Sequence, residues 1–163
     1  GYIAPATNGQ HCVGSSFKLR DDDLTLRAAE HQENLDKLSL ALPQWQAQLD
    51  SLDTRELQGR VGFRCASPDY LPIAGPVPER NRFLQDYAAL RKNARKPVFH
   101  RGTFVPGLYV NTAHGSRGLT SAPLCAQLLA AHICNEPAPV SRTLQRAVSP
   151  ARFLVRDLAR NRI

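Results

Sequence analysis

The pattern of hydrophobic and small residues between Leu108 and Cys134 predicts a strand, a turn and a helix in direct succession. Leu108 to Thr112 is rich in residues that favour a pleated surface, and Ala113 to Gly118 is a turn of mostly small residues. We expect the helix to hold Ser121 and Pro123 in its first turn and to end at Asn135. Its expected buried stripe consists of Leu124, Leu128 and Ala131, flanked by Cys125, Leu129 and Ile133.

This central stretch has the geometry of a ligand site. Gly115 and Gly118 allow positive φ and let backbone approach a ligand closely. The start of a helix presents N–H groups without intrahelical partners and a positive dipole end, which suits an electron-rich or anionic group. Strand-turn-helix connections with glycines are also common without any ligand, so an ordinary structural connection is the competing interpretation.

The N-terminal third predicts a hairpin followed by helices. Tyr2 to Ala6 and His11 to Phe17 form the two arms, and the Asn-Gly pair in the turn between them favours a tight hairpin. A helix is expected from the three aspartates at Asp21 to about Ala41, and a shorter one over Gln44 to Leu52. Arg60 to Ala66 is predicted to be a strand.

The remaining segments are shorter. Ser67 to Gly75 is a loop with an extended run, and residues 80–96 form either a basic helix or a surface insertion. Val98 to Phe104 is predicted as a strand, followed by a turn at Pro106-Gly107. Ser141 to Ile163 predicts one or two short helices divided near Ser149-Pro150. The fold class is therefore α+β, with an antiparallel or mixed sheet and flanking helices.

Four cysteines, at positions 12, 65, 125 and 134, show no CxxC pair and no ligand-like histidine spacing. We expect reduced, mostly buried thiols, no metal site and a cytoplasmic protein. No apolar run reaches the length of a membrane span. Because the chain starts at Gly1 and has no methionine, we expect it to be a fragment of a longer protein.

The charge is distributed unevenly. Residues 1–59 carry 5 basic and 9 acidic side chains, residues 60–140 carry 10 and 4, and residues 141–163 carry 6 and 1. We therefore expect residues 141–163 to form a basic C-terminal helical tail distinct from residues 1–140. Such asymmetry favours a polyanionic partner, and a basic solvated face is the alternative.

The order of three motifs resembles the C-terminal half of the FAD-dependent D-amino-acid oxidase and glycine oxidase superfamily. The motifs are GYIAPATNGQHCVGSSF, VGFRCASPDYLPIAG and LYVNTAHGSRGLTSAP. A finer likeness, in RVGFRCASPDYLPIAGPVP, HGSRGLTSAPLCAQLLA and SPARFLVRDLAR, is to bifunctional members that complete 5-methylaminomethyl-2-thiouridine in bacterial tRNA. This resemblance implies an FAD-dependent amine oxidoreductase that removes the carboxymethyl group from a modified wobble uridine, with tRNA as partner. A stand-alone amino-acid oxidase and a non-catalytic basic RNA-binding module are the alternatives.

Two departures from the superfamily pattern matter. The superfamily's Trp-x-Gly-x-Arg-Pro is replaced by Arg60-Val-Gly-Phe-Arg64-Cys65, which puts a free small amino acid in doubt as substrate. The GxGxxG fingerprint that holds the FAD pyrophosphate is not found. The resemblance therefore implies that the main Rossmann unit and the methyltransferase half lie outside this chain, and that the chain alone is inactive and binds FAD weakly or not at all.

The resemblance also implies roles for single residues. Arg64 matches the arginine that clamps the substrate carboxylate, a role suited to its planar guanidinium. Without the resemblance, a strand arginine paired with a carboxylate is the ordinary interpretation. The residues that match the segment packed against the flavin ring are His114, Gly115, Ser116, Arg117, Gly118, Leu119 and Thr120. We favour a structural turn histidine over a catalytic base for His114, and a turn-forming role for Asp69.

The basic C-terminal tail contains Arg152, Arg156 and Arg160, spaced four residues apart and so expected on one helical face. Phe153, Leu154 and Leu158 are expected to anchor this helix and to leave the arginines outward. These arginines are candidates for contacts to tRNA phosphates, and a solvated surface is the equally weighted alternative.

Overall fold

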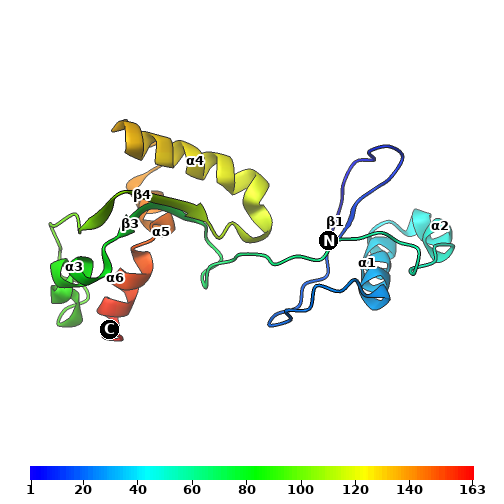
Figure 1. Cartoon of the computed structure of the whole chain (residues 1–163), viewed down its shortest axis with the longest axis horizontal. Coiled ribbons are helices and arrows are strands. Elements are labelled where there is room, and N and C mark those ends of the chain that lie inside the picture. The colour runs from blue at the N-terminus through cyan, green and yellow to red at the C-terminus, as the bar shows by residue number, and fades with distance from the viewer. The chain divides into compact units, whose positions relative to one another are not determined.

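The computed structural model describes all 163 residues, which pack as two units, Gly1–Phe63 and Arg64–Ile163 (Figure 1). The first unit contains a two-stranded sheet and two helices, and the second contains another two-stranded sheet and four helices. The architecture is thus α+β with small antiparallel sheets, as the sequence predicts. None of the helices is both long and apolar enough to cross a membrane.

The N-terminal hairpin is confirmed. β1 (Tyr2–Ile3) pairs antiparallel with β2 (Val13–Gly14), and a bridge between Thr7 and Gln10 closes the turn. Asn8 and Gly9 both have positive φ, at 52° and 75°, as a two-residue hairpin turn requires.

α1 (Ala28–Ala41) starts later than the predicted helix, and the expectation of helix from Asp21 was wrong. The side chains of Asp21 and Asp23 accept hydrogen bonds from backbone N–H groups two residues onward, which holds this segment in turns. Both carboxylates also pair with Arg27, at 2.7 Å. These local contacts compete with helix formation, so the helix begins after Arg27.

A short helical region follows α1, as predicted. It consists of the 3₁₀ turn η1 (Pro43–Trp45) and α2 (Gln46–Asp50). The predicted strand over Arg60–Ala66 is wrong, because these residues pair with no neighbouring strand except at one bridge between Ala66 and His114.

The second unit is built on β3 (Ile73–Pro78) and β4 (Phe104–Thr112), which pair antiparallel. The register shifts between Pro76, opposite Tyr109, and Pro78, opposite Phe104, so β4 bulges there. Pro106 and Gly107 therefore lie within the strand, with Gly107 at φ 70°, and not in the predicted turn before it.

Of the basic segment 80–96, the part up to Arg91 is helical and residues 92–96 are not. α3 (Arg80–Asp86) is followed by the 3₁₀ turn η2 (Ala88–Arg91), and Phe83 is buried between Tyr87, stacked at 4.4 Å, and Phe104. Residues 98–103 are not the predicted strand. Gly102 turns there at φ 79° so close to the Phe83 ring that a Cβ would lie 2.4 Å from it.

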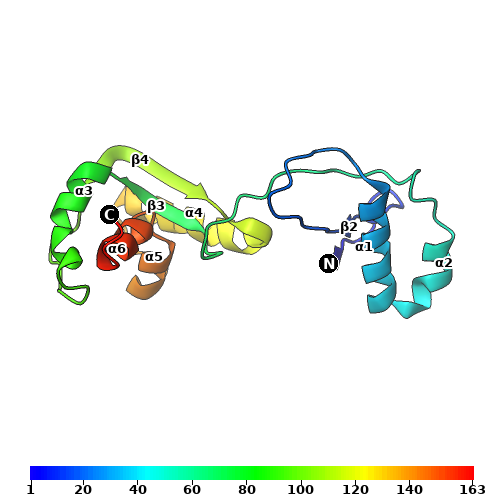
Figure 2. The same ribbon diagram turned by 90° about the horizontal axis from the view of Figure 1, so that it is seen from below.

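α4 (Gly118–Cys134) lies along one face of the sheet, with α5 (Arg142–Val148) and α6 (Arg152–Ala159) on the other (Figures 1 and 2). α5 packs against β3 and α6 packs against η2, and Leu158 of α6 is fully buried. The break between α5 and α6 confirms the predicted division near Ser149-Pro150.

The buried stripe of α4 is narrower than predicted. Cys125, Leu128 and Ala131 are buried, whereas Leu124 is 45% exposed and Ile133 is 61% exposed. Cys125 is also the one buried cysteine, and burial raises its pKa. The expectation that most thiols are buried was wrong, because the other three cysteines are exposed.

Asn135 ends α4 in the left-handed conformation, at φ 56° and ψ 39°, as the predicted stop requires. We expect Asn135→Ala to lower the free energy of unfolding by about 0.5–1 kcal/mol, because alanine tolerates positive φ poorly. Asn135→Gly is the matched control and should leave stability unchanged or slightly raised. Thermal unfolding followed by circular dichroism measures both, and equal melting temperatures for the two variants would contradict this account.

Candidate functional site

The turn between β4 and α4 forms the centre of the candidate site. Ala113 is buried and has φ 59°, Gly115 has φ 57°, and the 3₁₀ turn η3 (Gly115–Arg117) leads directly into α4. Two nearby positive-φ positions allow the chain to turn at the end of β4 and enter the helix within a few residues. The strand, small-residue turn and helix predicted from the sequence are all present. The placement of Pro123 in the first helical turn was wrong, because α4 already begins at Gly118 and Pro123 therefore lies in its second turn.

A hydrogen-bond chain fixes this turn. The Ser121 hydroxyl donates to the Arg117 carbonyl at 2.8 Å, and Ser121 Oγ lies 2.9 Å from His114 Nδ1. Because the hydroxyl has a single hydrogen, His114 Nδ1 is the donor in the second bond. Thr120 also donates to the Arg117 carbonyl, at 2.9 Å. His114 therefore braces the turn through its side chain.

The start of α4 is suited to an electron-rich group. No side chain caps it, and its first turn contains no acidic residue. Leu119 is 98% exposed, and Ser116 and Arg117 just before it in the chain are exposed as well. N–H groups of a first helical turn that lack side-chain partners, together with the helix dipole, stabilise negative charge near the helix N-terminus.

The segment containing Arg64 is attached to this turn. The Gly115 N–H donates to the Cys65 carbonyl at 2.9 Å, and Ala66 forms a bridge with His114. Cys65 Sγ also lies 3.7 Å from Thr112 Oγ1 at the end of β4. Arg64 is exposed and immediately precedes this contact. The fold thus brings the predicted carboxylate clamp and the predicted flavin-contacting residues together from positions about fifty apart in the sequence.

Asp69 is held in place just beyond this segment. Its carboxylate accepts hydrogen bonds from the Ser67 hydroxyl at 2.8 Å and from the Leu71 N–H at 3.3 Å, so it stabilises a turn, as predicted. Arg152 donates to both of its oxygens, at 2.9 Å and 2.8 Å. This bidentate guanidinium is the largest cause that holds the pKa of Asp69 well below its ordinary value.

The outward orientation expected for Arg152 was therefore wrong. Its side chain is only 10% exposed, and it also donates to the carbonyls of Val148, Ser149 and Leu71. Arg156 is partly exposed and Arg160 is exposed, and both stay candidates for phosphate contacts.

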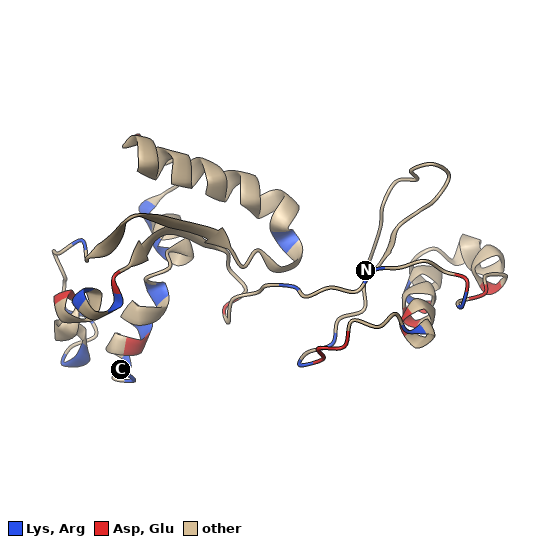
Figure 3. Ribbon diagram, in the orientation of Figure 1, with Lys and Arg blue, Asp and Glu red and all other residues tan.

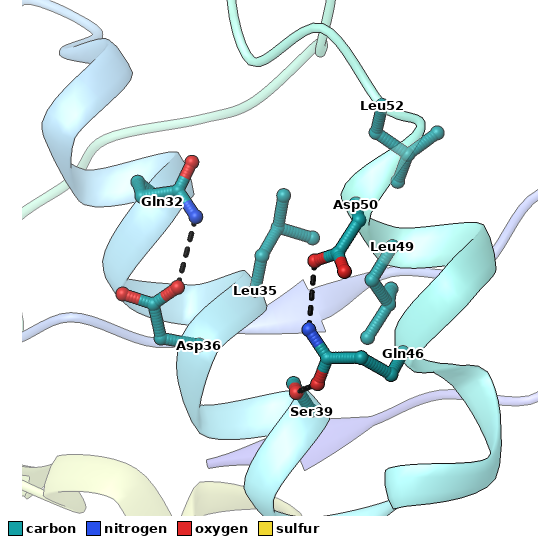
Figure 4. Close-up of a pocket in the computed structure, with 8 residues that line it drawn as sticks. All are labelled: Gln32, Leu35, Asp36, Ser39, Gln46, Leu49, Asp50 and Leu52. Carbon is teal, nitrogen blue, oxygen red and sulfur yellow. Dashed lines mark hydrogen bonds between the residues drawn. The ribbon is translucent and has the colours of Figure 1, made fainter.

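One hollow in the first unit is not a promising ligand site. It lies between α1 and α2, and its polar side chains bind one another: Gln32 to Asp36, Gln46 to Asp50, and Ser39 to Gln46 (Figure 4). Groups already satisfied in this way offer little to a ligand. No group of three or more histidine, cysteine or acidic side chains is arranged to hold a metal ion.

Comparison with known proteins identifies relatives over almost the whole chain. The profile of the FAD dependent oxidoreductase family matches residues 1–132. The chain is 48% identical to the tRNA 5-methylaminomethyl-2-thiouridine biosynthesis bifunctional protein MnmC of Pseudomonas aeruginosa strain UCBPP-PA14 over 98% of its length and 25% of that protein. The proteins of the same name from Chromobacterium violaceum and Stutzerimonas stutzeri are 46% and 49% identical, over 100% and 98% of the chain and 25% and 24% of those proteins. The chain thus spans about a quarter of the length of these relatives.

Proposed function

Because the chain belongs to the family of FAD-dependent oxidoreductases, we propose that it is the C-terminal half of a flavin-dependent amine oxidoreductase domain that acts on tRNA. The proposed substrate is 5-carboxymethylaminomethyl-uridine, or its 2-thio form, at the wobble position. In the proposed reaction, two-electron oxidation of the glycine-like C–N bond to an imine, followed by hydrolysis with water, would release the carboxymethyl carbons as glyoxylate and leave an aminomethyl group. A methyltransferase part of the same cytoplasmic protein would methylate that group. Residues 1–140 belong to the oxidoreductase domain in this proposal, and residues 141–163 are its basic tail.

The observation that carries the proposal is the attachment of Arg64 to the turn before α4. The hydrogen bond from Gly115 to Cys65 fixes the backbone next to Arg64 against the residues that match the family's flavin segment. A carboxylate held by Arg64 would then lie close to a group bound at the start of α4. That is the arrangement needed to bring the α-carbon of an N-substituted glycine beside a flavin.

The residues present fit one end of FAD. The start of α4, with no side-chain cap and no acidic residue, suits the carbonyl-bearing edge of the flavin ring, and His114 to Thr120 would line it. When bound, FAD supplies the electron sink for oxidation of the C–N bond. The sequence has no GxGxxG turn for the pyrophosphate, so that contact is assigned to another part of the full protein.

The outer face of α4 supports the same assignment. Leu119, Leu124 and Ile133 are exposed, and α4 contains no charged residue from Gly118 to Cys134 (Figure 3). A helix that is apolar on both sides is normally covered on both sides. The relatives are about four times as long as this chain. We infer that the FAD-binding part of the longer protein covers this face of α4.

The test uses the full-length protein. We expect the purified protein to show the visible absorbance of oxidised flavin, and its addition to tRNA bearing the carboxymethylaminomethyl group to bleach that absorbance without oxygen. Mass spectrometry of the digested tRNA should then show loss of the carboxymethyl group. A colourless protein that still binds tRNA would favour the non-catalytic RNA-binding module, and oxidation of free glycine alone would favour a stand-alone amino-acid oxidase.

We expect the 163-residue chain by itself to bind FAD weakly or not at all, because the contacts to adenosine and pyrophosphate are assigned to another part of the protein. Equilibrium dialysis against FAD measures this directly, with the full-length protein as the positive control. A submicromolar complex with the isolated chain would contradict the assignment of the pyrophosphate site to another part.

A further inference from the structure

Seven basic side chains from two distant segments gather in the second unit. η2 packs against α6, and Arg91 Nε donates to the main-chain oxygen of Ile163 at 2.7 Å. These contacts bring residues 91–96, with the sequence RKNARK, to the C-terminal end of α6. The basic surface, as we name it, consists of Arg91, Lys92, Arg95, Lys96, Arg156, Arg160 and Arg162.

The charge of the basic surface is hardly neutralised. Asp157 is the one acidic residue in the two segments, and its Oδ1 lies 3.7 Å from Arg156 Nε. The other six basic residues are exposed, and blue ribbon accordingly gathers around η2 and the end of α6 (Figure 3). Arg156 is additionally held over the Phe153 ring, at 4.9 Å from its centre. Such a surface repels itself unless a polyanion covers it.

An exposed aromatic ring follows the basic run directly. Phe99 comes three residues after Lys96 and is 94% exposed. The loop that carries it is fixed next to α3, because the Tyr87 hydroxyl donates to the His100 carbonyl at 3.0 Å. An exposed phenylalanine that directly follows a run of basic residues matches the way single-stranded nucleic acids are bound, with phosphates on basic side chains and a base stacked on the ring.

We propose that the basic surface and Phe99 bind an RNA strand, with the phosphates on the arginines and lysines and an unpaired base stacked on Phe99. This inference rests on the proposed function and deepens it, since it says where the chain holds its RNA substrate. Arg152 is paired with Asp69 and is therefore not part of the proposed RNA site. Residues 91–96 take its place and contact the phosphates together with Arg156 and Arg160.

RNA fits better than an anionic membrane. Stable membrane attachment needs a substantial apolar insertion besides the basic charge, and Phe99 is a single ring. RNA needs only spaced cations and a stacking surface.

The experiment measures binding of unmodified tRNA to the full-length protein by fluorescence anisotropy over a series of salt concentrations. Lys92→Gln, Arg95→Gln and Lys96→Gln together should raise Kd on the order of ten- to a hundredfold and make the dependence of log affinity on log salt shallower by about two units. The matched control removes three exposed basic residues of the first unit, Lys18, Lys37 and Arg55, and should change neither quantity.

A second variant tests the stacking. Phe99→Ala should weaken binding by about five- to a hundredfold without changing the salt slope, and Phe99→Tyr should restore affinity. If the basic surface is only a solvated face, neither the Lys92, Arg95 and Lys96 triple variant nor Phe99→Ala should change the affinity for tRNA. An unaltered Kd and salt slope in the triple variant would overturn the proposal, and so would a preference for vesicles of anionic phospholipid over tRNA.

Failure of this inference can be told apart from failure of the proposed function. If wild type reduces its flavin on modified tRNA but the triple variant binds tRNA as tightly, the proposed function stands and the basic surface is not the RNA site. If the variant of Lys92, Arg95 and Lys96 binds tRNA weakly yet reduces its flavin at the wild-type rate with saturating tRNA, the proposed function and the RNA site are both supported. If wild type neither binds tRNA nor reacts with it, both are overturned.

Discussion

Arg64→Lys in the full-length protein is expected to lower the catalytic efficiency on carboxymethylaminomethyl-tRNA by about ten- to a hundredfold. Hydrogen bonds to charged groups contribute roughly 1.5–3 kcal/mol, and an ammonium group cannot reproduce the two parallel N–H donors of the guanidinium. Single-turnover reduction of the flavin, measured at several tRNA concentrations, gives both the rate of the chemical step and the apparent affinity. A clamp that orients the glycine α-carbon should lower mainly the rate at saturating tRNA.

Arg60→Lys provides the matched control, since Arg60 is also exposed but lies before the contact between Cys65 and Gly115. It should leave the rate and the affinity close to those of wild type. Unchanged kinetics in Arg64→Ala would assign the carboxylate clamp to a different residue without contradicting the flavin site before α4. Flavin content should be equal in all three variants, because Arg64 is proposed to contact substrate and not cofactor.

The sequence predicted those elements whose causes are local. The Asn8-Gly9 hairpin, the stop at Asn135 and the break near Pro150 depend on backbone conformations that neighbouring residues determine. The errors arose where the secondary structure of a segment depends on side-chain hydrogen bonds or on pairing with a strand far away in the sequence. The helix from Asp21 was lost to carboxylate hydrogen bonds, and the strand over residues 60–66 lacks a partner strand in this chain.

The same distinction applies to the candidate site. The turn from Ala113 to Gly118 could be predicted from strand propensity, glycines and helix periodicity. Its contact with Cys65 and Ala66 is a pairing across about fifty residues, which no periodicity indicates, and only the family resemblance brought Arg64 into the site. The pair between Asp69 and Arg152 was missed altogether, because the charge pattern of α6 alone places Arg152 on a face with Arg156 and Arg160.

Arg152 ties the basic tail to the loop that follows Arg64, and its removal should destabilise that connection. Arg152→Gln leaves the partly buried carboxylate of Asp69 without its charged partner and leaves the carbonyls of Val148, Ser149 and Leu71 with fewer donors. Arg152 is 10% exposed and Asp69 is 30% exposed, so this pair is not fully buried. Arg152→Gln should therefore lower the free energy of unfolding by about 1.5–3 kcal/mol, which is less than the loss expected for a fully buried pair.

Amide hydrogen exchange, followed by mass spectrometry in the full-length protein, can detect this change locally. The amides of β3 and α6 should exchange about ten- to a hundredfold faster in Arg152→Gln if they open together. Arg142→Gln, which removes an exposed arginine from α5, is the control and should leave their protection unchanged. Equal protection in both variants would mean that packing of Leu158, and not the ion pair, holds α6 in place.

Acid should reproduce the effect of the substitution. The pKa of Asp69 is lowered in the folded protein, so the folded state binds fewer protons at this carboxyl than the unfolded state. Its contribution to stability is therefore complete above the unfolded pKa of about 3.9 and is lost as the pH falls toward the lower folded pKa. The difference in protection between wild type and Asp69→Asn should stay constant from pH 7 to about pH 5 and shrink below about pH 4. A difference that grew on acidification would show that Asp69 is not stabilised as the carboxylate, and the bidentate pair with Arg152 would then not be what anchors the tail beside the candidate site.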